Sequence, residues 1–211
     1  MNVLSIDFDI IMAPDIALYN PMVHPGPDGK SVTVDDLMKD FPMLNGCRAD
    51  LNHYHKIFSY LLDNIKHLNV KDIRIAFNHE DIKYLLDECS DAHVYSIDHH
   101  HDLGYPRRGP EGPEKEDFCT CANWGDYYFR QGIITDFTWI KNNNSDESPE
   151  YKNNPNVHMV NLQEFDLNSL PKMDKLFMCL SPEWTASSYF PLFYILLDVI
   201  NSQKGCHLDI N

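Results

Sequence analysis

The amino-acid sequence predicts an α/β protein: a single-domain, three-layer αβα sandwich with a mostly parallel sheet, spanning residues 1–211. Short apolar segments alternate with segments of helical spacing, and this order is typical of a parallel sheet with helices on both faces. The chain of 211 residues is long enough for one domain with a buried core. Its hydrophobic fraction, 43%, is ordinary for a globular protein.

Six segments are predicted strands because they are short and largely apolar, namely residues 3–6, 73–77, 93–97, 133–140, 157–162 and 175–180. Helical spacing of apolar residues predicts helices over about residues 50–67, around residues 82–89 and over about 121–131. Residues 188–200 are apolar on nearly every side, which predicts a buried helix. Pro, Gly and Asn predict loops at residues 20–29, 106–113 and 141–156.

The composition restricts the partners and the compartment. A formal net charge of −15 disfavours nucleic acid and anionic membranes as partners and suits cationic substrates or divalent cations. The sequence has no run of 18 apolar residues, and its first residues do not resemble a secretory signal. We therefore expect a cytoplasmic protein with no nucleic-acid or membrane partner, in which all six cysteines are reduced thiols.

Acidic and imidazole side chains follow four of the predicted strands. They are Asp7 and Asp9 after the first strand, His79 after the second, Asp98, His100 and Asp102 after the third, and Glu183 after the last. Because binding sites in parallel sheets form beyond the carboxyl ends of the strands, we expect these groups to converge on one edge of the sheet.

The spacing of these residues predicts a metal site. In an extended backbone, alternate residues such as Asp98, His100 and Asp102 point to the same side. Carboxylates clustered in this way repel one another, and a pair of divalent cations removes the repulsion. Mixed imidazole and carboxylate ligands suit Mn²⁺ or Zn²⁺, and two such ions can activate a water between them. Two simpler interpretations remain. The Asp-x-Asp pattern of Asp7 and Asp9 after a strand could arise by chance, and His79 could cap the helix that begins near Glu80.

These residues resemble the motifs of the ureohydrolases, the arginase and agmatinase family. The family carries strands that end in Gly-Gly-Asp-His, Asp-x-His-x-Asp and Asp-x-Asp. Similar segments here are Phe77-Asn78-His79-Glu80, Asp98-His99-His100-His101-Asp102 and Ser5-Ile6-Asp7-Phe8-Asp9. The resemblance implies an arginase-like fold and two Mn²⁺ ions held by six ligands, which are Asp7, Asp9, His79, Asp98, His100 and Asp102.

The whole chain most resembles the small peptide arginases, which convert arginine side chains of a ribosomal precursor peptide to ornithine and release urea. The shared features are the Asp98–Asp102 segment, Asn123-Trp124 and residues 181–184, Ser-Pro-Glu-Trp. The resemblance implies an arginine-containing precursor peptide as partner. Four features differ from the larger ureohydrolases. The Asp-x-Asp strand comes first, the Gly-Gly-Asp before the metal-binding histidine is absent, and the chain is shorter. Asn123-Trp124-Gly125 also occupies the stretch where they carry a proton-shuttling histidine.

Hydrolysis of a guanidinium group needs a carboxylate that binds it and an acid that protonates the leaving amine. Glu183 is the candidate for the first role, in a position similar to a glutamate of the ureohydrolases. Asn123 and Trp184 are further substrate-binding candidates, and Trp184 could stack on the guanidinium plane. The candidate acids are His99, His101 and Asp126, and one of the two histidines could instead orient a metal ligand.

Three other functions fit parts of the pattern. Phosphoesterases with an Asp-His-His motif also carry an N-terminal Asp-x-Asp, although the sequence lacks their histidine before Asp7. A deacetylase on an arginase-like scaffold would bind one zinc ion, whereas Asp9 and Asp102 favour two ions. A metal-binding or partner-binding domain without catalysis is the third, because the proton-shuttling histidine has no match.

Overall fold

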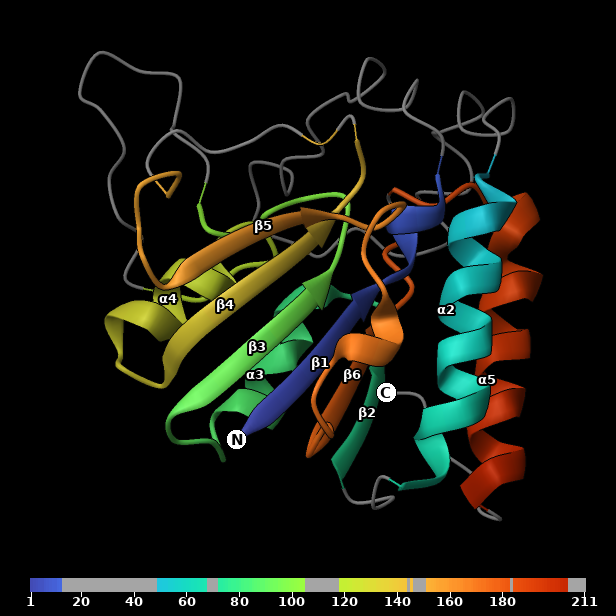
Figure 1. Ribbon diagram of the computed structural model, residues 1–211, viewed down its shortest axis with the longest axis horizontal. Helices are drawn as coiled ribbons and strands as arrows, with labels where there is room; N and C mark the ends of the chain where they lie inside the picture. Colours follow the sequence, from blue (N-terminus) through green and yellow to red (C-terminus); the bar gives the residue numbers. More distant parts are fainter. Residues whose placement is uncertain are drawn as a thin grey trace, which may run out of the picture.

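The structure, a computed structural model, describes residues 1–12, 49–67, 72–104, 118–143, 145, 151–182 and 184–204. In this part of the chain six strands form one sheet, and every pair of neighbours is parallel (Figure 1). The strands are β1 (Asn2–Asp7), β2 (Ile73–Ala76), β3 (Ala92–Ile97), β4 (Ile134–Lys141), β5 (Val157–Asn161) and β6 (Lys175–Cys179). The expected α/β class with a parallel sheet is confirmed, and all six predicted strands are present.

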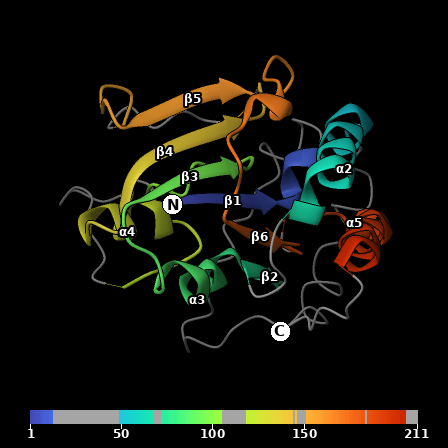
Figure 2. The ribbon, with the colours of Figure 1, turned by 60° about the horizontal axis from the view of Figure 1, so that its bottom comes forward.

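Four α-helices in the described residues cover the two faces of the sheet (Figure 2). The helices α2 (Leu51–Asn64) and α5 (Phe190–Lys204) pack together on one face, while α3 (Lys83–Leu86) and α4 (Trp124–Arg130) lie on the other. Short 3₁₀ helices complete the description: η1 (Phe8–Ile11), η4 (Ile65–His67), η6 (His79–Ile82), η7 (Leu167–Ser169) and η8 (Ser187–Tyr189).

The strand order, β2-β6-β1-β3-β4-β5, explains which helix lies on which face. The connection from β1 to β2 runs toward one edge of the sheet, whereas the connections from β2 to β3 and from β3 to β4 run the opposite way. Because crossover connections between parallel strands are right-handed, opposite directions place α2 on one face and α3 and α4 on the other. After β1 the chain crosses toward β2, and after the neighbouring strand β3 it crosses the other way, toward β4. The position between β1 and β3 is therefore a topological switch point, and open α/β sheets form binding sites beyond the carboxyl ends of the strands at such a point.

Alternate residues of β1 face two different cores. Leu4 and Ile6 pack in the core beneath α2 and α5, and Val3 packs in the core beneath α3 and α4. The two-residue period of a strand therefore turns Ser5 and Asp7 to the same side as Val3. The polar end of the central strand points toward the layer that contains α3 and α4.

Two expectations about helices need correction. The predicted helix around residues 82–89 is shorter, because residues 79–82 form η6 and only Lys83–Leu86 are α-helical. The helix α5 is not buried all round: Tyr194 is 43% and Ile195 44% exposed. This helix contacts the sheet and α2 on one side, so its remaining apolar residues face outward.

Several other expectations meet the structure only in part. The predicted loops at residues 20–29 and 106–113 lie outside the described residues, and β4 continues to Lys141 at the start of the third loop. Four cysteines are described, and all are free thiols: Cys89, Cys119, Cys121 and Cys179. Among the described helices, none has the length and apolar character needed to cross a membrane.

Neighbouring leucines of α2 test the assignment of the core. Leu61 is 1% exposed and Leu62 is 42% exposed. We expect Leu61→Ala to lower the free energy of unfolding by about 2–5 kcal/mol, because it leaves a cavity between α2 and the sheet. The matched control, Leu62→Ala, should change it by no more than about 0.5 kcal/mol. Urea unfolding followed by circular dichroism measures both, and equal losses would contradict the packing of α2.

Candidate metal centre

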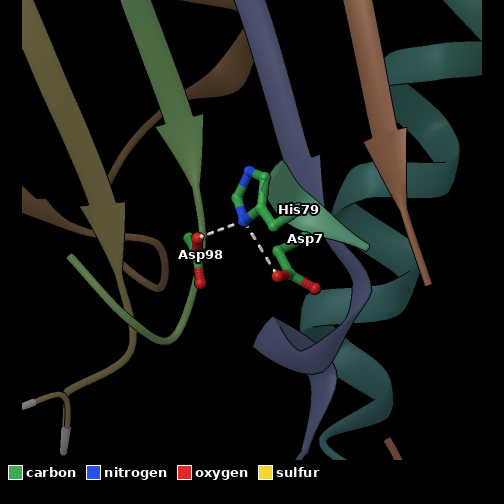
Figure 3. Close-up of side chains that lie close together, drawn as sticks. All are labelled: Asp7, His79 and Asp98. Atoms are coloured by element: carbon green, nitrogen blue, oxygen red, sulfur yellow. Dashed lines mark ion pairs between the residues drawn. The ribbon is translucent and has the colours of Figure 1, made fainter. Parts of the chain in front are cut away.

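The six predicted ligands converge at the carboxyl ends of the strands. Asp7 is the last residue of β1, Asp98 follows the neighbouring strand β3, and His79 begins η6 directly after β2. Figure 3 shows the side chains of Asp7, His79 and Asp98 pointing toward one another. The convergence that the sequence predicted is therefore present, although β6 lies between β1 and β2.

One half of the cluster surrounds His79. Its Nδ1 lies 3.0 Å from Asp7 Oδ2, 3.2 Å from Asp98 Oδ2 and 2.9 Å from Asp102 Oδ2. All four side chains are buried. On the other edge of the ring, Nε2 lies 2.9 Å from Ser5 Oγ.

The other half of the cluster contains His100. Its Nδ1 lies 2.8 Å from Asp9 Oδ2 and 4.0 Å from Asp98 Oδ1. Asp98 is therefore common to both halves, with Oδ2 toward His79 and Oδ1 toward His100. The His100 side chain is 23% exposed, so this half is the one that solvent reaches.

The local structure around Asp7 sets the direction of Asp9. The Asp7 side chain caps η1 by accepting a hydrogen bond from the backbone N–H of Asp9. Asp9 lies in the first turn of η1, and its Oδ1 accepts a hydrogen bond of 3.3 Å from the backbone N–H of His99. The two motifs, Asp-x-Asp and Asp-x-His-x-Asp, are thereby joined directly.

The donor atoms fit divalent cations. His79 Nδ1, Asp98 Oδ2 and Asp9 Oδ2 are inaccessible to solvent, and none makes a hydrogen bond of acceptable geometry. A single imidazole nitrogen carries at most one proton, so it cannot satisfy three carboxylate oxygens at once. The ligand atoms of Asp7, His79 and Asp98 lie within 4.8 Å of one another, as do those of Asp9, Asp98 and His100. Oxygen and imidazole donors in these two groups suit Mn²⁺ or Zn²⁺.

The charges of the cluster lead to the same conclusion. Burial raises the pKa of Asp98 well above its usual value, and the neighbouring carboxylates of Asp102, Asp7 and Asp9 raise it further. Burial and the Asp9 carboxylate also raise the pKa of Asp7. Burial alone would lower the pKa of His100, but the Asp9 carboxylate outweighs it and raises the pKa to about 9. Protons therefore stabilise the cluster when no cation is bound, and cations would replace them.

The structure separates the candidate acids. Asp126 accepts hydrogen bonds from Arg130 Nε, at 2.7 Å, and from the Tyr151 hydroxyl, which makes it a structural carboxylate. His101 is buried and its Nδ1 accepts the backbone N–H of Leu103 at 3.1 Å, so at least one of its nitrogens is engaged in fixing the loop. His99 is partly buried, and its ring lies edge-on to His100 at 5.0 Å between centroids. This position makes His99 the better candidate.

The predicted substrate-binding residues have different surroundings. The Asn123 side chain accepts a hydrogen bond from the backbone N–H of Thr120 at 2.7 Å and donates one to the carbonyl of Phe118 at 3.1 Å. These contacts give Asn123 a structural role in its own loop and do not support substrate binding. Trp184 is partly buried, with its ring centroid 4.6 Å from that of His100. Glu183 lies outside the described residues.

Two serines that the sequence analysis did not select contact the cluster. Ser181 Oγ donates a hydrogen bond of 2.7 Å to Asp7 Oδ2, and Ser5 Oγ lies beside His79. Ser181 follows β6, which pairs with β1 so that Cys179 is opposite Asp7. Its position after a predicted strand could have marked Ser181 as a site residue. A serine is common at such positions, however, and the sequence does not predict that β6 pairs with β1.

No family model, curated protein or solved structure matches this chain. What the chain does is therefore inferred from the geometry and chemistry of the cluster. The metal-binding role of the six residues stays a prediction that their arrangement supports.

The raised pKa of His100 predicts how pH acts on the metal-free protein. Because the pKa rises from 6.5 to about 9 on folding, protonated His100 contributes stability that is fully present below pH 6.5 and is lost as pH rises through 9. We expect the free energy of unfolding in the presence of a chelator to fall between pH 6.5 and 9. Saturating Mn²⁺ should remove most of this fall, because cations then take the place of the protons. Urea unfolding at a series of pH values measures it. His100→Gln should make the fall smaller without abolishing it, because the pKa of His79 is also raised, despite burial, by hydrogen bonds to Asp102, Asp7 and Asp98.

Proposed function

We propose that this protein is a manganese-dependent peptide arginase, which hydrolyses the guanidinium group of arginine side chains in a precursor peptide to give ornithine and urea. The observation that carries the proposal is the two-part cluster: His79 and His100 each lie among carboxylates, and Asp98 is shared between them. This is the ligand arrangement that the resemblance to the ureohydrolases implies. In this proposal the parallel α/β fold is arginase-like, and the free thiols fit the cytoplasm.

Each half of the cluster would hold one cation. His79, Asp7, Asp98 and Asp102 form the first set of ligands, and His100, Asp9 and Asp98 form the second. Two bound Mn²⁺ ions would supply an acidified water as nucleophile and would stabilise the negative charge that develops in the transition state. The protein's own contribution is to hold four carboxylates close together in a buried site, which makes the site selective for cations.

The substrate side chain would approach along the exposed edge of His100. Trp184 lies beside this edge, and its indole plane suits stacking on a planar guanidinium group. Glu183, next in sequence, would bind the two guanidinium nitrogens with its paired carboxylate oxygens. As the C–N bond breaks, the departing ornithine nitrogen takes a proton, and His99 is the residue that would donate it.

Urea release distinguishes this function from its rivals. We expect urea from an arginine-containing peptide only when Mn²⁺ is present, because the acidic cluster has no nucleophile without cations. The measurement is colorimetric urea detection, with mass spectrometry of the peptide to show that arginine has been converted to ornithine. Free arginine and a phosphodiester are the parallel substrates. Cleavage of the phosphodiester would favour the Asp-His-His phosphoesterases, and metal binding without turnover of any substrate would favour a non-catalytic domain.

Two substitutions should separate metal binding from substrate binding. Asp98→Ala removes the carboxylate common to both halves, so we expect it to abolish uptake of Mn²⁺ and activity together. Glu183→Gln should leave the Mn²⁺ content unchanged and lower activity by at least about 100-fold, because the guanidinium loses its charged partner. Metal content by elemental analysis and urea release are measured for both variants. Asp63→Ala, on the exposed side of α2, is the control, because it also removes one negative charge but lies outside the cluster. Loss of metal in Glu183→Gln would show that its role is misassigned.

A further inference from the structure

Asp102 has a backbone conformation that its neighbours must hold in place. Its φ is +50°, in the left-handed region, and among the six candidate ligands it is alone in this respect. An aspartate adopts this region more readily than most residues, but at a cost in free energy. Asp102 is also the last member of its motif, beyond the end of β3, so no strand pairing fixes it.

The first turn of α4 makes two hydrogen bonds to Asp102. Trp124 Nε1 donates to Asp102 Oδ2 at 2.7 Å, and the backbone N–H of Gly125 donates to the carbonyl of Asp102 at 2.9 Å. The oxygen that accepts the indole N–H is the one that lies 2.9 Å from His79 Nδ1. The indole thus occupies one side of this oxygen and leaves its other side directed at His79.

Gly125 allows this close approach. A Cβ at this position would lie 3.0 Å from the carbonyl oxygen of Asp102 and 2.9 Å from Leu103 Cδ2. The Leu103 side chain can shift, but the carbonyl of Asp102 or the start of α4 must move by a few tenths of an ångström to admit a Cβ. The pair Trp124-Gly125 therefore acts on both the side chain and the main chain of Asp102.

We propose that Trp124 is a positioning residue that secures the cation in the His79 half of the cluster and leaves the His100 half unaffected. The inference rests on the proposed function, because it takes the six residues as metal ligands. Its selectivity follows from the contacts: Asp102 pairs with His79, whereas His100 pairs with Asp9 and Asp98. Groups that orient metal ligands typically change metal affinity about 10- to 100-fold when removed.

The protein contains a matched control in Trp139. This indole is also fully buried, and its Nε1 donates a hydrogen bond of 3.0 Å to the backbone carbonyl of Asp98. Trp139→Phe and Trp124→Phe therefore remove the same chemical group from equally buried positions. They differ in the acceptor, which is a backbone carbonyl for Trp139 and a ligand carboxylate oxygen for Trp124.

The experiment measures Mn²⁺ binding to the full chain by equilibrium dialysis and by electron paramagnetic resonance. Wild type should bind two ions with the signal of a coupled pair. We expect Trp124→Phe to bind one ion with unchanged affinity and the second about 10- to 100-fold more weakly, with the signal of a single ion at limiting Mn²⁺. Saturating Mn²⁺ should restore the coupled signal, and Trp139→Phe should bind as wild type does.

The outcomes separate this inference from the proposed function. If wild type binds no Mn²⁺, the proposed function is wrong and this inference with it. If wild type binds two ions and Trp124→Phe binds both with the same affinities, or if Trp139→Phe shows an equal loss, only the positioning role is overturned. Gly125→Ala provides a second variant, which keeps the indole but displaces the Asp102 backbone. It should show the same selective loss, and unchanged binding by this variant would count against the proposal.

Discussion

The mutual repulsion of buried carboxylates is the constraint on which this site depends. Asp7, Asp9, Asp98 and Asp102 lie together out of water with two imidazoles among them. Four ionised carboxylates in such a place are costly unless positive charge is supplied. Burial and the neighbouring carboxylates raise the pKa of Asp98 and Asp7, whereas the pKa of Asp9 and that of Asp102 are lowered, despite burial, by His100 and His79. Two divalent cations would supply four positive charges to balance the four carboxylates. The orphaned atoms of Asp9, His79 and Asp98 lie where such cations would be bound.

The fold brings these groups together through the order of its strands. β1 lies between β6 and β3, so a motif from the very start of the chain stands beside one that begins at residue 98. All strands are parallel, and their carboxyl ends therefore share one edge. Because the connections after β1 and β3 run in opposite directions, α2 and α4 lie on opposite faces of the sheet, which leaves room for a site beyond the ends of β1 and β3. The N-terminal position of Asp-x-Asp is thus compatible with the same convergence.

Strand positions and the ligand motif could be predicted from the sequence because both depend on local pattern. The run before Asp98 is apolar and short, and the alternate spacing of Asp98, His100 and Asp102 needs no tertiary information. The burial of α5 could not be predicted, since it depends on how much of the helix α2 and the sheet cover. The role of Ser181 depends on Asp7 of another strand, and that of Asp126 depends partly on Tyr151 of a later segment, so residue type alone did not reveal them. Asn123 is bonded within its own loop, and its residue type did not distinguish this role from substrate binding.

The two halves of the cluster differ in their exposure to solvent, and under the proposed function this difference would decide the direction from which a substrate enters. His79 is stacked against Phe177 at 5.5 Å between centroids, lies 5.0 Å from Trp124 and is fully enclosed. His100 has a partly exposed side chain with Trp184 beside it. Under the proposed function, a substrate would therefore meet the His100 half first, because His79 is buried among the described residues. In that proposal the buried half would hold the shared Asp98, and the partly exposed half would admit the arginine side chain.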